Sequence, residues 1–183
     1  DLLFAAASEC LLELARDPNR LGADLALTAV LHTWTRKLLL HPHVHCIVSG
    51  GGLALDGSRW INAPPRYLFP VKVLGALLRG KILDGLRRAH ARGTFDGFDD
   101  FDDPEGFDRL MRRLVSKDWV VYAKRAFAGP EHVYRYLGRY THRVGIANSR
   151  LVSLADDQVT FRTKSGKTIT VHAVEFLRRL LLH

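Results

Sequence analysis

Three histidines occupy alternate positions in the stretch HPHVHC, at residues 41, 43 and 45. The apolar run around them predicts a β-strand over residues 43–50, on which His43 and His45 point to one side and Val44 to the other. Neutral imidazoles on a rigid strand can bind a divalent metal of the manganese-to-zinc group, or magnesium if oxygen ligands complete the shell. The spacing therefore predicts part of a metal site.

Two further histidines are candidates for a third ligand. His32 stands eleven residues before His43 on a second predicted strand, residues 25–34, and antiparallel pairing of the two strands could bring it beside the pair. His41 is the other candidate. Histidines spaced in this way on a strand are also common as ordinary polar residues, so the metal interpretation needs support from elsewhere in the chain.

That support comes from the stretch YRYLGRYTHR at residues 134–143. Proline at position 130 favours the start of a helix, on which Tyr136 and Tyr140 would lie one turn apart on the same face. A tyrosine hydroxyl can act as a covalent nucleophile when a nearby cation or metal activates its target. The alternative is an amphipathic helix that packs both rings in the core and leaves their hydroxyls at its rim.

Basic residues follow the same helical spacing beside the two tyrosines, and their guanidinium groups are suited to phosphate oxygens: Arg135, Arg139 and Arg143. His132 lies one turn before Tyr136, and we expect it to pack rather than to approach a metal.

The hydrophobic pattern predicts the elements that position these groups. We expect helices over residues 2–16, 71–92 and 105–116, from residue 130, and at the C-terminal end. We expect strands over residues 25–34, 43–50 and 119–127, a short strand before residue 63, and strands around the turns ADD and KSGK; an acidic surface loop covers 93–106. These elements predict an α+β fold, a mostly antiparallel sheet with helices packed on it, in a single domain over residues 1–183.

Composition narrows the class of partner. The net charge is +8, yet the stretch DGFDDFDDPE holds six of the nineteen acidic residues, so the rest of the chain is strongly basic. This excess favours a polyanionic partner, nucleic acid before an anionic membrane surface. Two cysteines are too few for a disulfide scaffold, and no apolar run is long enough to span a bilayer; we therefore expect a cytoplasmic protein in a reducing compartment.

The ordered set of motifs resembles a known family. HPHVHCIVSGGG, GPEHVYRYLGRYTHR and the flanking stretches LLFAAASECLLELARDP, AVLHTW, WVVYAK and FLRRLLLH are similar to the two-tyrosine branch of the HUH nucleases, the rolling-circle transposases of the insertion sequence ninety-one type. The resemblance covers most of the chain. It implies an HUH-nuclease-like fold and an enzyme that is a transposase, a single-strand DNA endonuclease and a strand transferase.

The resemblance also implies roles for individual residues. His43 and His45, with His32 as the third ligand, would bind a divalent metal, Mg or Mn, and Tyr136 and Tyr140 would be the catalytic tyrosines. The implied reaction nicks and rejoins single-stranded DNA at the transposon end through a 5′-phosphotyrosine intermediate, during rolling-circle DNA transposition and recombination. No membrane is implied, and no protein partner can be inferred.

Aromatic residues could stack on the bases of such a strand, although a place in the core is expected for each of Trp34, Trp60 and Tyr122. Family members usually carry an N-terminal zinc-binding region and a first β-strand ahead of the segment that corresponds to residue 1, so we expect this chain to be truncated. Two other hypotheses stay open: an inactive remnant that binds DNA without cleaving it, and a histidine-metal hydrolase that uses activated water.

Overall fold

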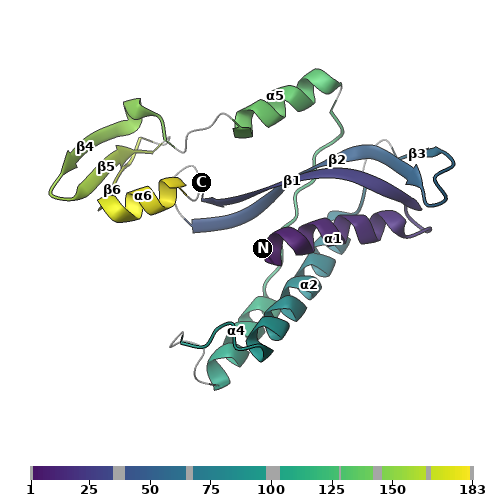
Figure 1. The fold of residues 1–183 in the computed structure, drawn as a ribbon, viewed down its shortest axis with the longest axis horizontal. Coiled ribbons are helices and arrows are strands. Elements are labelled where there is room, and N and C mark those ends of the chain that lie inside the picture. Colours follow the sequence, from purple (N-terminus) through teal and green to yellow (C-terminus); the bar gives the residue numbers. More distant parts are fainter. Residues whose placement is uncertain are drawn as a thin grey trace. The chain divides into compact units, whose positions relative to one another are not determined.

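The computed structural model of the protein describes residues 2–34, 40–64, 68–97, 104–127, 129–141, 146–163 and 166–181. The strands form two three-stranded sheets, ordered β1-β2-β3 and β4-β5-β6, and helices precede, separate and follow them along the chain (Figure 1). The prediction of an α+β fold is confirmed. The elements are α1 (Leu2–Arg16), β1 (Ala23–Trp34), β2 (Leu40–Ala54), β3 (Trp60–Asn62), α2 (Val71–Ala91), α4 (Pro104–Ser116), α5 (Pro130–Thr141), β4 (Leu151–Ala155), β5 (Gln158–Arg162), β6 (Thr168–His172) and α6 (Ala173–Leu181).

The contacts divide the chain into two compact units. One unit comprises Asp1–Ala29 and Cys46–Ala126, and the other comprises Val30–His45 and Phe127–His183. Strands β1 and β2 contribute residues to both. The interpretation of residues 1–183 as one domain stays a prediction.

The core of the first unit is built on helix α1. Ala6, Cys10 and Leu14 are buried and are spaced four residues apart, which places them on one helical face. They pack with residues of β1 and α2, among them Leu25 and Leu74. The predicted helix over residues 2–16 is confirmed, and it ends immediately before Asp17–Pro18 because proline restricts the residue that precedes it.

Strand β2 is longer than predicted because it continues through the three glycines. A Cβ atom on Gly52 would lie 2.5 Å from the carbonyl oxygen of Asp24 in β1, and one on Gly51 would collide with the carbonyl oxygen of Ile61 in β3. The glycines therefore allow close approach of the neighbouring backbones on both sides of β2. They keep β1, β2 and β3 in one sheet, as the predicted pairing of the first two strands requires.

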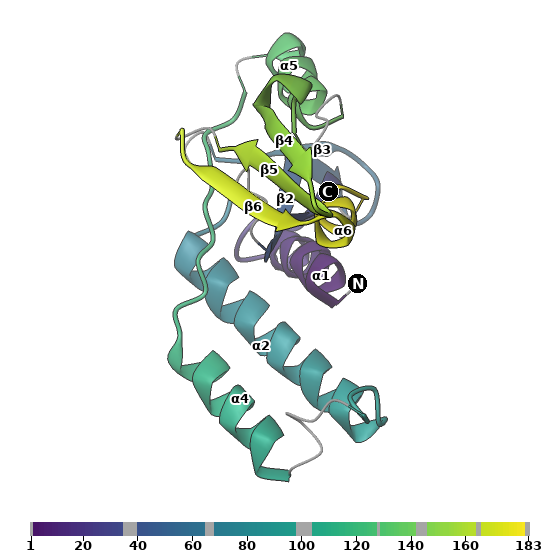
Figure 2. The same ribbon diagram turned by 90° about the vertical axis from the view of Figure 1, so that its left-hand side faces the viewer.

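Helices α2 and α4 lie side by side in both views (Figures 1 and 2). Leu83 of α2 packs against Phe107 and Met111 of α4 in a small apolar cluster. Both helices were expected from the sequence. Between them, residues 92–97 form turns, as expected for an acidic loop; the rest of that predicted loop up to residue 103 lies outside the described residues.

The strand predicted over residues 119–127 is wrong, because the structure assigns no strand there. The prediction rested on the β-branched and aromatic residues of this segment; burial does alternate at its start, with Trp119 and Val121 more buried than Val120 and Tyr122. Val120 is 89% exposed and Tyr122 is 80% exposed. A strand also needs a hydrogen-bonded neighbour, and no strand in the described part of the chain pairs with this segment.

The second unit contains a small sheet covered by a helix. Strands β4, β5 and β6 are antiparallel, and α6 packs on them through a cluster of Ile146, Val159, Phe161 and Phe176. Asp156 and Asp157 have positive φ angles of 49° and 57°, which is the backbone that a two-residue hairpin turn requires. The strands predicted around the ADD turn and the helix after them are confirmed.

Candidate metal and tyrosine site

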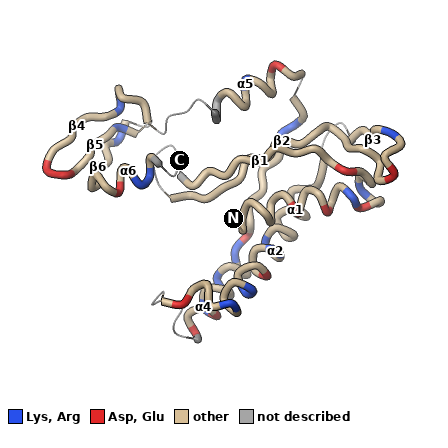
Figure 3. The backbone as a smooth tube through the Cα atoms, in the orientation of Figure 1, with Lys and Arg blue, Asp and Glu red and all other residues tan. Residues whose placement is uncertain are grey.

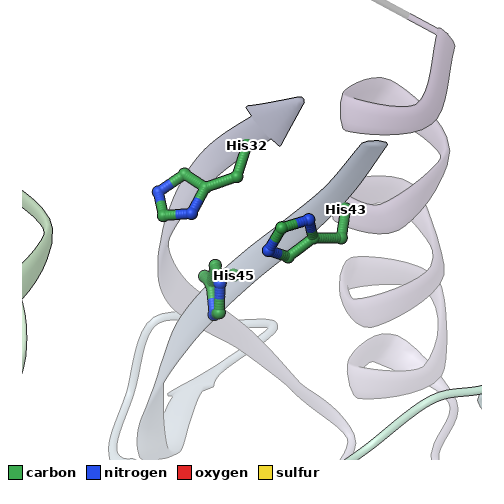
Figure 4. Close-up of side chains that lie close together, drawn as sticks. All are labelled: His32, His43 and His45. Carbon is green, nitrogen blue, oxygen red and sulfur yellow. The ribbon is translucent and has the colours of Figure 1, made fainter. Parts of the chain in front are cut away.

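Three histidines from two strands lie together in the second unit (Figure 4). His43 and His45 share one side of β2, as the period of two predicts, and His32 comes from β1. One ring nitrogen from each lies within 4.8 Å of the other two, and the ring centroids of His32 are 5.3 Å from His43 and 4.7 Å from His45. All three side chains are partly buried.

His41 does not belong to this group of three potential ligands, although its ring centroid lies 5.1 Å from that of His43. His41 contributes to the site through its backbone carbonyl, which contacts the ring of His43. The Nδ1 atom of His43 lies 2.7 Å from the carbonyl oxygen of His41. A carbonyl oxygen can only accept, so Nδ1 carries the proton and the lone pair of His43 is on Nε2. A backbone atom thus fixes the tautomer in which Nε2 can bind a metal.

The environment of His45 favours its neutral form. Partial burial lowers the pKa of His45 below its usual value of 6.5, and the nearby His43 lowers it further. A metal binds only the unprotonated nitrogen of an imidazole. His45 is therefore available as a ligand at a pH where an ordinary histidine begins to take up a proton.

A tyrosine hydroxyl reaches the histidine cluster from helix α5. The hydroxyl oxygen of Tyr136 lies 3.2 Å from Nδ1 of His45. The Tyr136 ring also lies 5.4 Å from the ring of Phe127, measured between centroids. Helix α5 begins at Pro130 with Glu131 in its first turn, as the sequence predicts. The structure therefore brings together residues 32, 43, 45 and 136, as expected.

For two of the other predicted residues of helix α5, the structure describes the backbone and not the side chain. Tyr140 and Arg139 lie within α5 by their backbones, but their side chains lie outside the described residues, as does the whole of Arg143. Arg135 is exposed. His132 is exposed as well, so the expectation that it packs is wrong.

Two features of the site escaped the sequence analysis. Phe127 contacts the ring of Tyr136, yet it falls in the segment that was predicted as a strand, and no pattern pointed to this role. The carbonyl of His41 orients His43, and no pattern in the sequence pointed to this contact. The expectation of core positions was wrong for Trp60, which is 53% exposed, and for Tyr122; the side chain of Trp34 lies outside the described residues.

The donor set fits a divalent metal. Three imidazole nitrogens from two neighbouring strands face one another, and the tautomer of His43 leaves a lone pair for coordination. Nitrogen donors favour the manganese-to-zinc group, whereas magnesium prefers oxygen and would need water or substrate oxygens in addition.

Among the described residues, no helix is long and apolar enough to cross a membrane.

Comparison with known proteins identifies the family. A family model described as "Putative transposase" matches residues 26–183, a span that includes the three histidines and the tyrosine helix. The chain belongs to this transposase family. No solved structure matches it, so the HUH-nuclease-like fold stays a prediction.

Two curated relatives match along the whole chain. "Putative transposase y4qJ" of Sinorhizobium fredii is 46% identical over 191 residues, and the "Transposase for insertion sequence element IS801" of Pseudomonas savastanoi pv. phaseolicola is 26% identical over 200 residues. The alignments cover 48% and 45% of these relatives. The chain therefore spans about half the length of the curated relatives that it matches.

Proposed function

We propose that this chain nicks and rejoins single-stranded DNA at a transposon end through a 5′-phosphotyrosine intermediate, in rolling-circle transposition. The observation that carries the proposal is the distance of 3.2 Å between the hydroxyl oxygen of Tyr136 and Nδ1 of His45, a member of the three-histidine cluster. Membership of the transposase family and the similarity to the insertion sequence transposase support DNA as the substrate.

The histidines would hold the metal cofactor of this reaction. His32, His43 and His45 offer three nitrogens within 4.8 Å of one another. A divalent cation bound there, Mg or Mn, would supply positive charge beside the scissile phosphate. That charge would stabilise the negative charge on the phosphate oxygens in the transition state. With Nε2 of His45 as the ligand atom, its Nδ1–H would donate to the hydroxyl oxygen of Tyr136 and hold that oxygen in place.

Tyr136 is the proposed nucleophile. Its hydroxyl oxygen loses a proton and forms a bond to phosphorus, and the bond from phosphorus to the 3′-oxygen of the preceding nucleotide breaks. The 3′-oxygen takes up a proton and leaves as a hydroxyl. One phosphate ester replaces another, so the free 3′-hydroxyl can attack the phosphotyrosine and restore the strand.

Tyr140 is proposed as the second nucleophile. It follows Tyr136 by one helical turn in α5, so a second strand could be cut while the first stays attached to Tyr136. Arg135, Arg139 and Arg143 follow the same spacing and would bind the phosphates of the strand being cut.

Formation of a covalent adduct tests the proposal. The purified chain is incubated with single strands that tile the DNA flanking its gene and carry a label at the 3′ end, which stays on the fragment joined to tyrosine; Mn²⁺ or Mg²⁺ is added, and the products are separated on a denaturing gel. We expect a labelled protein adduct that is lost in the Tyr136→Phe, Tyr140→Phe double variant and in His43→Ala. Tyr134→Phe is the matched control, because Tyr134 lies in the same helix and is 72% exposed.

Two outcomes would contradict the proposal in different ways. Cleavage that survives the double phenylalanine variant without any adduct would support a histidine-metal hydrolase that uses activated water. Binding of DNA without cleavage of any tiled strand by the folded, metal-supplemented chain would support the inactive-remnant hypothesis.

A further inference from the structure

A groove lies between helices α2 and α4 of the first unit, in a region that shares no residue with the histidine and tyrosine site. Its volume is about 650 Å³. Phe107 and Met111 of α4 form an apolar floor and are only 6% and 7% exposed. His90 of α2 stacks on Phe107, with ring centroids 3.9 Å apart and planes 9° from parallel, so the two helices contact each other along the groove.

Two arginines line the groove from opposite helices, Arg87 from α2 and Arg112 from α4. Both are exposed, and neither makes an ion pair or hydrogen bond with another described residue. Their neighbours differ: Arg88 pairs with Asp84 at 3.1 Å, and Arg109 pairs with Glu105 at 3.4 Å. The two lining arginines thus keep their donors available for a ligand.

The surroundings of the groove are basic. Helices α2 and α4 carry eight lysines and arginines against three acidic residues. Basic residues mark both helices in Figure 3. Among the described residues that line the groove, Asp108 is the one carboxylate and Arg87 and Arg112 are the two guanidinium groups. The net charge of the lining is positive and suits an anionic ligand.

We infer that the α2–α4 groove binds a segment of single-stranded DNA. The inference rests on the proposed function for the choice of DNA as the ligand. Guanidinium groups bind phosphate oxygens in a bidentate manner, and an apolar floor can cover the face of a sugar or base. A single strand exposes these apolar faces, whereas a duplex keeps its bases stacked inside.

Binding without cleavage tests this inference. Fluorescence anisotropy measures affinity for a labelled single-stranded oligonucleotide in the absence of divalent metal. The unchanged chain is compared with the Arg87→Ala, Arg112→Ala double variant. The matched control is Arg88→Ala, Arg113→Ala, which removes the same charge from the same helices at positions that do not line the groove. Circular dichroism and thermal melting establish that both variants are folded.

The Arg87→Ala, Arg112→Ala variant is expected to bind the oligonucleotide about fivefold or more weakly than the unchanged chain. The control variant is expected to lose less than about twofold in affinity. Loss of two phosphate contacts should also lower the slope of log affinity against log salt by about 1.4, since each contact to a single strand contributes about 0.7. Equal weakening in both double variants, or unchanged binding in the lining variant, would overturn the inference.

Competition identifies the class of ligand. A duplex of the same length that competes as well as the single strand, with the same sensitivity to the lining pair, would overturn the single-stranded assignment. A polyglutamate peptide that displaces the oligonucleotide at matched charge would indicate an acidic protein partner instead. Adduct formation by the lining variant at saturating DNA separates the two proposals, because loss of groove binding leaves the chemistry of Tyr136 intact.

Discussion

At the scale of single residues, a backbone carbonyl decides which nitrogen His43 can offer to a metal. The carbonyl oxygen of His41 accepts the Nδ1–H of His43 at 2.7 Å, so the side chain of His41 is not needed for this orientation. This separates two neighbouring histidines that look equivalent in the sequence.

Single alanine variants of the histidines test this distinction. We expect His32→Ala, His43→Ala and His45→Ala each to weaken Mn²⁺ binding by about tenfold or more, because each removes a ligand from a set of three. His41→Ala should bind within about twofold of the unchanged chain, since its carbonyl remains. Isothermal titration calorimetry measures both. Equal losses for His41→Ala and His43→Ala would contradict the assignment.

The lowered pKa of His45 predicts a dependence of stability on pH. In the folded protein burial and His43 disfavour the protonated form, whereas in the unfolded chain His45 titrates near its usual value of 6.5. As the pH falls below that value, the unfolded chain binds the proton first, so the stability of the fold decreases until the lower folded-state pKa is reached.

Metal-free melting temperatures at about pH 7.5 and pH 5.5 measure this effect. The unchanged chain should lose more stability over this interval than His45→Asn, which has no titrating imidazole at that position. A loss of the same size in both proteins would contradict the assignment to His45.

At the scale of elements, the glycines of α2 serve different purposes. Gly75 is buried, and a Cβ atom on it would lie 2.6 Å from the carbonyl oxygen of Trp119. Gly80 is exposed, and nothing lies within 4 Å of the position that its Cβ would take. The first glycine permits close packing of a backbone on the helix, and the second only lowers helix propensity.

Alanine substitutions at the two positions should therefore have opposite signs. Gly75→Ala should lower the free energy of unfolding by about 1–3 kcal/mol, because the Trp119 backbone must move. Gly80→Ala should raise it by about 0.5–1 kcal/mol through better helix propensity. Urea denaturation followed by circular dichroism measures both changes. Stabilisation by Gly75→Ala would show that the chain after α4 does not pack on the helix in this way.

At the scale of the whole molecule, the charge of +8 predicts how the chain binds DNA. Binding that depends on phosphate contacts releases counterions, so affinity falls with salt. Between roughly 50 and 200 mM NaCl we expect a loss of about tenfold or more, which corresponds to neutralisation of three or more phosphates of a single strand. Anisotropy titrations without divalent metal measure this loss. An affinity that does not change with salt would argue against a polyanionic partner.

Local patterns in the sequence were enough to predict most elements. The helices α1, α2, α4 and α5 and the hairpin at Asp156–Asp157 follow from spacings of apolar residues, prolines and turn residues that lie close together in the chain. The alternation of a strand likewise places His43 and His45 on one side of β2. The motifs also carried the family resemblance, which the match over residues 26–183 confirms.

The segment 119–127 shows the limit of local patterns. Its β-branched and aromatic residues are typical of a strand, but a strand exists only when another backbone completes its hydrogen bonds, and no described strand does so here. Trp60 and Tyr122 were expected in the core by residue type and are exposed, because burial depends on what other segments cover.

The sequence by itself determined which chemical groups this protein has and which of them share a helix face or a strand side, since those relations depend on near neighbours. Spacing left both His32 and His41 open as the third member of the histidine group and the family resemblance favoured His32, but only the tertiary structure places the His32 ring beside His43 and His45. It alone brought Tyr136 to His45 across 91 positions of the chain. Such contacts join segments that are distant in sequence, and only strand pairing and packing fix the distance between them.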